Sequence, residues 1–454
     1  DKNNGGSASV NARLNYFGRV NYDYNQKYLL EFVWRYDGSY IFPEAKRFGF
    51  FPGASVGWIL SEESFWSGIS NIVNHFKITG SWGQTGNDRI EAYQYLSSYS
   101  FSSQPFIFNE NLLAKALNEL RIANPNITWE VANQTNVGFE AQFLKGAVQL
   151  SANYFYNLRS NILAFRNASV PATSGLTLPR ENIGRVANRG FEIELAYRGS
   201  SGNFNYRVSA NAALAKNKIL FWDETPGVPE YQQSTGRPMN AGLYYLSMGV
   251  FKTQEDIDKY PHWANAKPGD LIFKDVNEDG AINGLDLVRY EKTDLPTFTG
   301  GFTVDLSYKN IFLSALFQGA AGAVRSYSLE SGLIGNFLAD DAYGRWTPDN
   351  TNADKPRAWN TGGYYWTNAI SGGTWGINNT YWLKNNDYLR LKTLQLGYNL
   401  PSKWLNKIGV NNASIYFTGL NLFTLAGFKS FDPETVGTVY PLSKVYNFGI
   451  KLTL

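Results

Sequence analysis

The feature that most constrains this chain is an alternation of apolar and polar residues within segments of roughly ten residues. Side chains on a β-strand point to opposite faces with period two, so each segment is predicted to be a strand with one apolar and one polar face. Representative apolar positions are Phe139, Leu150, Ile193, Val304 and Ile450. Representative polar positions are Asn136, Gln149, Glu194, Asp305 and Lys451.

The connections between these segments alternate between very short and very long. Short joints fall at 25–26, 145–146, 199–203 and 309–310, and long loops are expected at 85–132, 159–189, 217–298 and 320–385. Transmembrane barrels have short periplasmic turns and long extracellular loops, whereas compact soluble domains rarely carry several long loops. We therefore predict an all-β fold, a transmembrane antiparallel β-barrel with the apolar residues facing lipid and the polar residues facing the lumen.

The pattern predicts about thirteen strands in the barrel wall. They are expected to begin near residues 12, 27, 50, 75, 133, 146, 190, 203, 299, 311, 386, 412 and 444. The first and last strands both run towards the periplasm, which is consistent with an odd count. The strand-like run 93–101 would break this parity, so we place it in an extracellular loop. The apolar set changes phase between Leu391 and Leu394, which predicts a β-bulge.

Composition excludes several other classes of protein. Charged residues make up only 17% of the 454 residues, below the roughly 25% of soluble domains, and aromatic residues make up 16%. There is no Cys for disulfides or thiolate metal sites, and no apolar stretch approaches the ~18 residues of a membrane-spanning helix. A net charge of +3 gives no reason to expect nucleic acid as a partner. The polar start, residues 1–7, does not resemble a signal peptide, so an exported protein would have its N-terminus elsewhere.

A series of motifs resembles SusC/RagA-like TonB-dependent outer-membrane transporters. The motifs occur in the order found in that family and extend over nearly the whole chain. They are 35–43 (RYDGSYIFP), 47–58 (RFGFFPGASVGW), 80–87 (GSWGQTGN), 124–130 (NPNITWE), 182–192 (NIGRVANRGFE), 269–280 (GDLIFKDVNEDG), 296–301 (PTFTGG), 388–392 (YLRLK) and 396–401 (LGYNLP). One departure is the final Leu454, where many outer-membrane barrels end in an aromatic residue.

The resemblance implies a fold and a set of partners. Proteins of this family form barrels of about 22 strands with a plugged lumen, so residues 1–454 would be the C-terminal part of the barrel wall, without the plug and TonB box. The implied function is TonB-dependent import of a glycan, oligosaccharide or peptide across the outer membrane of a Gram-negative, Bacteroidota-like cell. The implied partners are the N-terminal plug and barrel portion, a SusD-like surface lipoprotein, the TonB–ExbB–ExbD complex, and membrane lipid including lipopolysaccharide.

A thirteen-strand wall would leave two strand edges without partners in lipid, where backbone polar groups must be satisfied internally. We therefore expect further polypeptide to pair with the strand near Leu14 and with the strand near Phe448.

Residues 275–286 match the spacing of a calcium-binding loop. Asp275, Asn277, Asp279, the carbonyl of Ala281 and Asp286 occupy ligand positions 1, 3, 5, 7 and 12, and a glycine occupies position 6. The site would be looser than usual, since Asp286 replaces the longer Glu, and the flanking residues suggest a strand rather than helices. An Asx-rich turn without an ion is the alternative. We expect a structural Ca²⁺ ion.

The long loop 320–385 is rich in tryptophan. Aromatic faces beside Asn and Asp suit stacking on sugar rings or peptide side chains. Packing within the loop, contact with a lid and a place in the interfacial belt are equally good interpretations. The candidate substrate contacts are Trp346, Trp359, Trp366, Trp375 and Trp382.

An enzymatic function is not expected. The two histidines, His75 and His262, lack partners at ligand spacing, and the sequence has no nucleophile elbow, P-loop or HExxH motif. Two alternatives to the SusC/RagA-like importer remain open. They are a siderophore or cobalamin receptor on the same fold, and a soluble or surface-anchored β-rich glycan-binding protein.

Overall fold

The computed structural model describes residues 8, 10–108, 112–166, 178–263, 266–326, 339–358, 378–405, 409–428, 430–435 and 442–453. The chain divides into two compact units. The first comprises Asp1–Phe191 and Lys216–Val228, and the second comprises Glu192–Ala215 and Pro229–Leu454. No helix of the described residues is long and apolar enough to cross a membrane.

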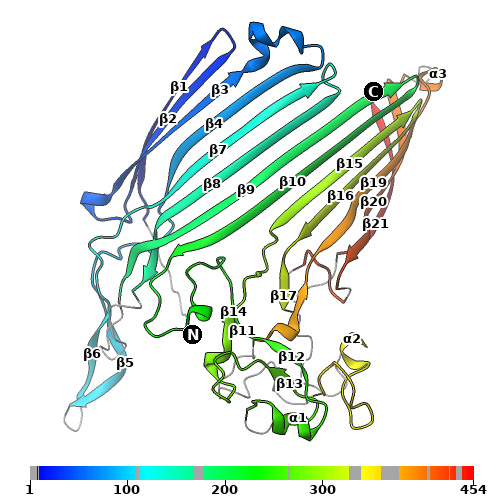
Figure 1. The fold of residues 1–454 in the computed structure, drawn as a ribbon. Helices are drawn as coiled ribbons and strands as arrows, with labels where there is room; N and C mark the ends of the chain where they lie inside the picture. Colours follow the sequence, from blue (N-terminus) through cyan, green and yellow to red (C-terminus); the bar gives the residue numbers. More distant parts are fainter. Residues whose placement is uncertain are drawn as a thin grey trace, which may run out of the picture. The chain divides into compact units, whose positions relative to one another are not determined.

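Thirteen strands form one antiparallel sheet, in which neighbours follow the chain order except where loop strands intervene (Figure 1). The strands are β1 (Arg13–Tyr24), β2 (Tyr28–Ser39), β3 (Phe48–Ile59), β4 (Val73–Asn87), β7 (Glu130–Phe143), β8 (Val148–Phe165), β9 (Arg180–Ser201), β10 (Phe204–Phe221), β15 (Phe298–Tyr308), β16 (Ile311–Ala321), β19 (Tyr388–Asn399), β20 (Asn412–Ala426) and β21 (Val445–Thr453). Within the described part of the chain the sheet is not closed, because β1 and β21 each have a single neighbour.

The remaining elements lie in the connections. Four two-stranded sheets pair β5 (Ser98–Phe108) with β6 (Leu112–Arg121), β11 (Leu243–Tyr245) with β14 (Leu287–Arg289), β12 (Ser247–Val250) with β13 (Leu271–Phe273), and β17 (Val324–Ser326) with β18 (Leu383–Asn385). The α-helices are α1 (Gln254–Lys259), α2 (Ala339–Ala342) and α3 (Ser402–Leu405). The 3₁₀ helices are η1 (Glu44–Lys46), η2 (Leu60–Glu62), η3 (Ser64–Gly68), η5 (Glu230–Gln232), η6 (Gly284–Asp286) and η7 (Thr380–Trp382).

The predicted antiparallel wall of thirteen strands is confirmed. The strand-like run near residue 98 pairs only with β6, outside the wall, as parity required. The predicted bulge is also present, since the register between β19 and β20 shifts between Leu391 and Thr393. Three expected loops, 85–132, 159–189 and 217–298, are shorter than predicted because β4, β7, β8, β9 and β10 continue into them. Both faces carry polar residues in the extensions of β8, β9 and β10, so the sequence shows no alternation there.

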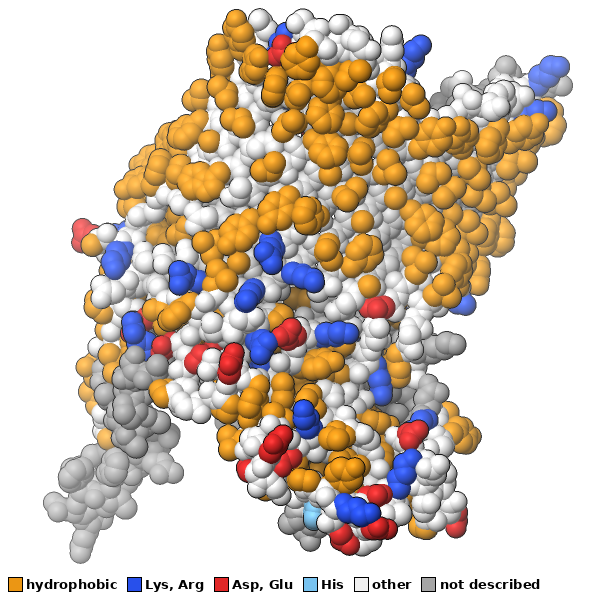
Figure 2. All heavy atoms as spheres, in the orientation of Figure 1, with side chains coloured by type: hydrophobic (Ala, Val, Ile, Leu, Met, Phe, Trp, Pro, Cys, Tyr) orange, Lys and Arg blue, Asp and Glu red, His pale blue; other side chains and the backbone are white. Residues whose placement is uncertain are grey.

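The register confirms that each strand has two chemically different faces. Phe139 lies opposite Ala152, and Val304 lies opposite Val208 and Ala315, so apolar residues of paired strands share a face. Asp305 lies opposite Arg207 and Ser314 on the other face. Figure 2 shows the hydrophobic side chains gathered over the strands in the view drawn.

Tight turns at the short joints explain why the adjoining strands end where they do. Asn25 and Gln26 have φ of 53° and 55°, and Lys145 and Gly146 have φ of 59° and 78°. Two consecutive residues with positive φ suit the twist of a tight hairpin, and Asn and Gly tolerate that conformation best. These joints therefore close adjacent strands without a loop.

Three of the motifs pack together in the first unit. Trp129, from 124–130, has its ring 5.0 Å from that of Phe42 and 5.4 Å from that of Phe51. Its indole N–H donates to the carbonyl of Arg47 at 3.3 Å. With Ile41 and Ile127 these residues form a buried core at one end of β3. The motifs therefore anchor connections to the wall.

Candidate functional site

The polar face of the sheet is the surface that a solute in the lumen would meet. In the second unit it is hollowed over a volume of about 570 Å³. Its lining includes Glu192, Glu194, Asn211, Thr299 and Gln318. Neither glutamate forms a hydrogen bond or ion pair with another described residue. Carboxylates and amides in this arrangement can accept hydrogen bonds from hydroxyl or ammonium groups.

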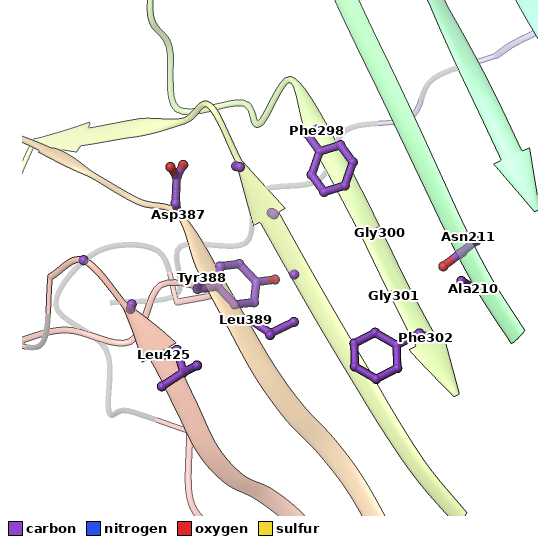
Figure 3. Close-up of a pocket in the computed structure, with 15 residues that line it drawn as sticks. Ala210, Asn211, Phe298, Gly300, Gly301, Phe302, Asp387, Tyr388, Leu389 and Leu425 are labelled. Atoms are coloured by element: carbon purple, nitrogen blue, oxygen red, sulfur yellow. The ribbon is translucent and has the colours of Figure 1, made fainter. Parts of the chain in front are cut away.

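The apolar face of the same strands has a second hollow, of about 660 Å³ (Figure 3). Its floor is formed where Gly300 lies opposite Gly319, so no side chain fills the space. Phe298, Phe302 and Leu425 border it. This hollow suits hydrocarbon rather than a polar solute.

A buried arginine joins β19 to the connection between β20 and β21. Arg390 is only 1% exposed, and its guanidinium donates to Asp432 at 2.6 Å, to Glu434 and to Thr424 at 2.8 Å. Lys392 adds a contact of 3.0 Å with Glu434. Since both carboxylates are mostly shielded from water, these interactions hold residues 430–435 against the polar face of the wall.

The long loops of the second unit contain a core of their own, which we call the lobe and define as residues 229–292, 342–358 and 378–385. Its buried residues are Tyr245, Val250, Trp263, Leu271, Phe273, Ile282 and Trp382. Leu271 is fully buried and Trp382 is 4% exposed. The connections are therefore folded around an apolar centre.

The tryptophans proposed as substrate contacts divide into two groups. Trp382 belongs to the core of the lobe, and Trp346 packs against that core while its indole N–H donates to the carbonyl of Lys252 at 3.1 Å. Packing, one of the interpretations considered above, accounts for both positions. Trp359, Trp366 and Trp375 lie outside the described residues.

A buried ion pair holds two segments of the lobe together. Asp270 is fully buried and accepts from Arg357 at 2.6 Å and from the backbone N–H of Lys267 at 2.7 Å. Gly269 has φ of +91°, and a Cβ there would lie 2.6 Å from the ring of Trp346. The start of motif 269–280 is therefore shaped by close packing, which requires glycine at this position.

The candidate calcium loop is held by hydrogen bonds from its own backbone and side-chain N–H groups. Asp275 Oδ2 accepts from the N–H of Gly280 at 2.8 Å, and Asp279 Oδ1 accepts from that of Ala281 at 2.9 Å. Asp286 is fully buried and accepts from Val276 and Asn283 at 2.8 and 2.7 Å. Asn277 donates its side-chain N–H to Asp279 at 2.8 Å. Gly280 has φ of +82°, as the loop spacing predicted.

The donor set fits a hard cation in part. Asp275 Oδ1 is buried without a hydrogen-bond partner, which leaves a carboxylate oxygen available as a ligand. The pKa of Asp279 is lowered, chiefly by the hydrogen bond from Asn277, so this group is charged at neutral pH. However, no three His, Asp or Glu side chains of the described residues converge as a ligand set. The calcium ligands therefore stay a prediction.

Comparison with known proteins identifies the wall. The family profile described as "TonB dependent receptor-like, beta-barrel" matches residues 2–422. The chain belongs to this family. The TonB-dependent receptor P26 of Formosa agariphila is 30% identical over 92% of this chain and 42% of its own length. The TonB-dependent receptor SusC of Bacteroides thetaiotaomicron is 25% identical over 98% of this chain and 44% of its own length.

Two solved structures show the same fold. The structure titled "Structure of the RagAB peptide transporter" superposes with a TM-score of 0.75 at 24% identity, covering 99% of this chain and 49% of that chain. The RagAB importer in the "open-open" state gives a TM-score of 0.76 at 23% identity, covering 100% and 48%. These superpositions show that the wall shares the fold of both structures. The chain spans less than half the length of these relatives.

Proposed function

We propose that this chain forms part of the wall of a transporter that imports an oligosaccharide or peptide across the outer membrane, energised by TonB. The observation that carries the proposal is a continuous antiparallel wall with one apolar and one polar face, in a chain of the TonB-dependent receptor family. An apolar face suits lipid, and a polar face with unpaired carboxylates suits a hydrated solute. The family consists of receptors and transporters rather than enzymes.

Uptake by cells tests this proposal. A deletion strain and its complemented parent receive fluorescent oligosaccharides and peptides, with and without a protonophore. We expect one class of substrate to accumulate only in the complemented strain and only without the protonophore. Accumulation that is unchanged by the protonophore would instead indicate a surface glycan-binding protein. A growth defect confined to iron or cobalamin limitation would indicate the siderophore or cobalamin receptor instead.

We propose that the lobe contacts a SusD-like surface lipoprotein. Support comes from its folded core and from exposed apolar residues such as Met248, which is 58% exposed. A photo-crosslinking residue at Met248 should capture the lipoprotein in intact cells, and one at Lys309, in the β15–β16 turn, should not. Capture from Lys309 alone would contradict the assignment of the lobe to the outer surface.

We also propose that further strands of the same transporter complete the wall and that its plug fills the lumen. Supporting this, Phe17 of β1 and Phe448 of β21 are 76% and 82% exposed, and each strand has a single described neighbour. Paired cysteines placed on β1 or β21 and on the N-terminal barrel portion should form disulfides. A wall that yields no such crosslink from either edge would contradict the proposal.

We propose, finally, that residues 275–286 bind a structural Ca²⁺ ion through Asp275, Asn277, Asp279, the carbonyl of Ala281 and Asp286. The available Oδ1 of Asp275 supports this. Bound calcium would supply positive charge that keeps the loop compact. Calcium should protect the lobe from proteolysis in the intact protein, and Asp275→Asn should abolish that protection. Asp258→Asn, on α1, is the matched control and should retain it. Calorimetry showing no calcium binding would leave only the Asx-turn interpretation.

A further inference from the structure

Two strands of the wall continue into a short stem that leads to the lobe. Only residues 322–323 separate β16 from β17, and only residues 386–387 separate β18 from β19 (Figure 1). Ala320 lies opposite Tyr388 in the wall, and Val324 lies opposite Asn385 in the stem. Between these two pairs one strand advances by one residue more than the other, so the ladder slips at this step.

The step between wall and stem has the features of a hinge. Gly322 has φ of +85°, which favours glycine, and a Cβ there would collide with the side chain of Thr297. The N–H of Gly322 donates to the carboxylate of Asp387 at 2.7 Å. Hinges are usually a few residues at the ends of elements, where changes in φ and ψ can be absorbed. Residues 322–323 and 386–387 fit this description.

A segment of the β20–β21 connection, residues 430–435, lies beside this step, and we call it the strap. The N–H of Glu434 donates to Asp432 Oδ1 at 2.9 Å, and the hydroxyl of Thr435 donates to the carbonyl of Asp432 at 3.0 Å. Pro433 is buried between them, and its ring fixes φ. The strap is therefore a compact turn with its own internal hydrogen bonds.

On the wall side, the strap is held by side chains of β19. Buried ion pairs join Arg390 to Asp432 and to Glu434. The hydroxyl of Tyr388 donates to Glu434 at 3.2 Å, and Lys392 contacts the same carboxylate at 3.0 Å. This side of the strap is therefore anchored below the hinge.

On the lobe side, the strap is held by the stem. Arg325 of β17 donates to the carbonyl of Thr435, and Asn386 donates its side-chain N–H to the carbonyl of Pro433 at 3.0 Å. Arg325 lies opposite Lys384 of β18, which belongs to the lobe. The strap is therefore bonded to β19 below the slipped step, to Asn386 within it and to β17 beyond it.

We propose that the strap is a brace that locks the lobe to the wall across a hinge at residues 322–323 and 386–387. While the strap is bound on both sides, bending of the stem has to break either the hydrogen bonds of Arg325 and Asn386 or the ion pairs of Arg390. Loss of either set frees the stem. The brace does not depend on which solute is transported, so its failure would leave the proposed import untouched.

Double electron–electron resonance on the intact transporter tests the brace. Spin labels at Asp258 on α1 and at Tyr308, at the far end of β15, report the distance between the lobe and the wall. The wild type should give one narrow distribution of distances. Arg325→Met/Asn386→Ala removes the donors on the lobe side, and Arg390→Leu removes the anchor on the wall side. Each should widen the distribution by roughly twofold or more, because each frees the hinge.

The combined variant distinguishes a brace from separate contributions to stability. Arg390→Leu already disconnects the strap from the wall, so adding Arg325→Met/Asn386→Ala should widen the distribution no further. Residues that act through one shared element are non-additive in this way. Limited proteolysis gives a second measurement. Residues 430–435 should stay protected in Arg325→Met/Asn386→Ala, where Arg390 still holds them, and should become accessible in Arg390→Leu.

Two control variants address general effects of charge. Lys292→Met removes an exposed charge from the connection between the lobe and β15, and it should leave the distribution narrow. Arg325→Lys keeps a donor for the carbonyl of Thr435 and should also leave it narrow. Heat-dependent migration on gels reports that each barrel is folded.

Two results would overturn the proposal. One is a narrow distribution in both Arg325→Met/Asn386→Ala and Arg390→Leu, which would show that the strap does not restrain the lobe. The other is a combined variant whose widening equals the sum of the separate effects, which would show that the two sets of contacts do not act through one brace.

Discussion

The wall and the lobe shield their apolar side chains from water in opposite ways. In the wall, Val304 and Asp305 are adjacent residues on opposite faces, and the apolar face is covered by lipid rather than by protein. In the lobe, Leu271 and Phe273 are buried against protein, as in a water-soluble domain. One chain therefore combines a region whose apolar residues face lipid with a region whose apolar residues are buried in protein. The stability of each region should be sensitive to a different kind of substitution.

The largest effect should follow from truncating the core of the lobe. Phe273 is 2% exposed and its ring packs against those of Tyr245 and Trp263 at 5.2 and 5.1 Å. Phe273→Ala should cost about 3–5 kcal/mol, because buried aromatic residues leave large cavities. Hydrogen exchange should increase across 243–289 while β15 and β16 stay protected. Equal loss of protection in the wall would show that the two regions are not separable.

A comparable effect is expected at the buried arginine. Arg390→Leu removes the partner of Asp432 and Glu434 and leaves two shielded carboxylates uncompensated, which should cost about 3–5 kcal/mol. Residues 430–435 should become accessible to protease without loss of the barrel. The matched variant, Arg390→Leu with Asp432→Asn and Glu434→Gln, should recover part of the loss. Full resistance of the single variant to protease would show that Arg390 does not hold this segment.

The two faces of the wall can be distinguished with one pair of substitutions. Val304→Lys, near the middle of β15, should cost about 2–4 kcal/mol because it places a charge against hydrocarbon. Thr303→Lys, one residue away on the polar face, should cost little. Denaturant unfolding in lipid vesicles measures both. The reverse order of effects would invert the assignment of the faces.

The smallest effect belongs to the short helix α1 of the lobe. Thr253 caps it by accepting from the N–H of Asp256 at 3.3 Å, so Thr253→Ala should destabilise the lobe by about 1 kcal/mol. The pKa of Asp256 is lowered, first by the hydrogen bond from the backbone N–H of Thr253. Its contribution is therefore present above the unfolded pKa of about 3.9 and is lost as pH falls through the lower folded value. Hydrogen exchange at 254–259 as a function of pH measures this loss.

The sequence predicted the wall because its physical rule is local. Alternation with period two placed Phe139 and Asp305 on their faces, and the change of phase near Leu391 located the bulge. The rule failed in 180–190, where residues such as Asn182 and Arg189 are polar on both faces, so the strand there was taken for loop.

The lobe could not be predicted in this way. Trp382 and Tyr245 meet across more than a hundred residues of sequence, and no local pattern encodes such a contact. The aromatic residues were noticed, but the sequence could not say whether they stack on a ligand or on one another. The ion pairs of the buried arginine could not be predicted either, since Arg390 and Glu434 lie on different segments of the chain.

The extension of β8, β9 and β10 past the apolar band has a consequence for how the cell surface is recognised. Residues such as Asn182 are held in place there, with side-chain hydrogen bonds of 2.8 Å to the carbonyls of Thr128 and Asn161. An antibody raised against a flexible peptide of this sequence would meet strands that are paired on both sides. Only an immunogen that presents several strands together would display this arrangement of side chains.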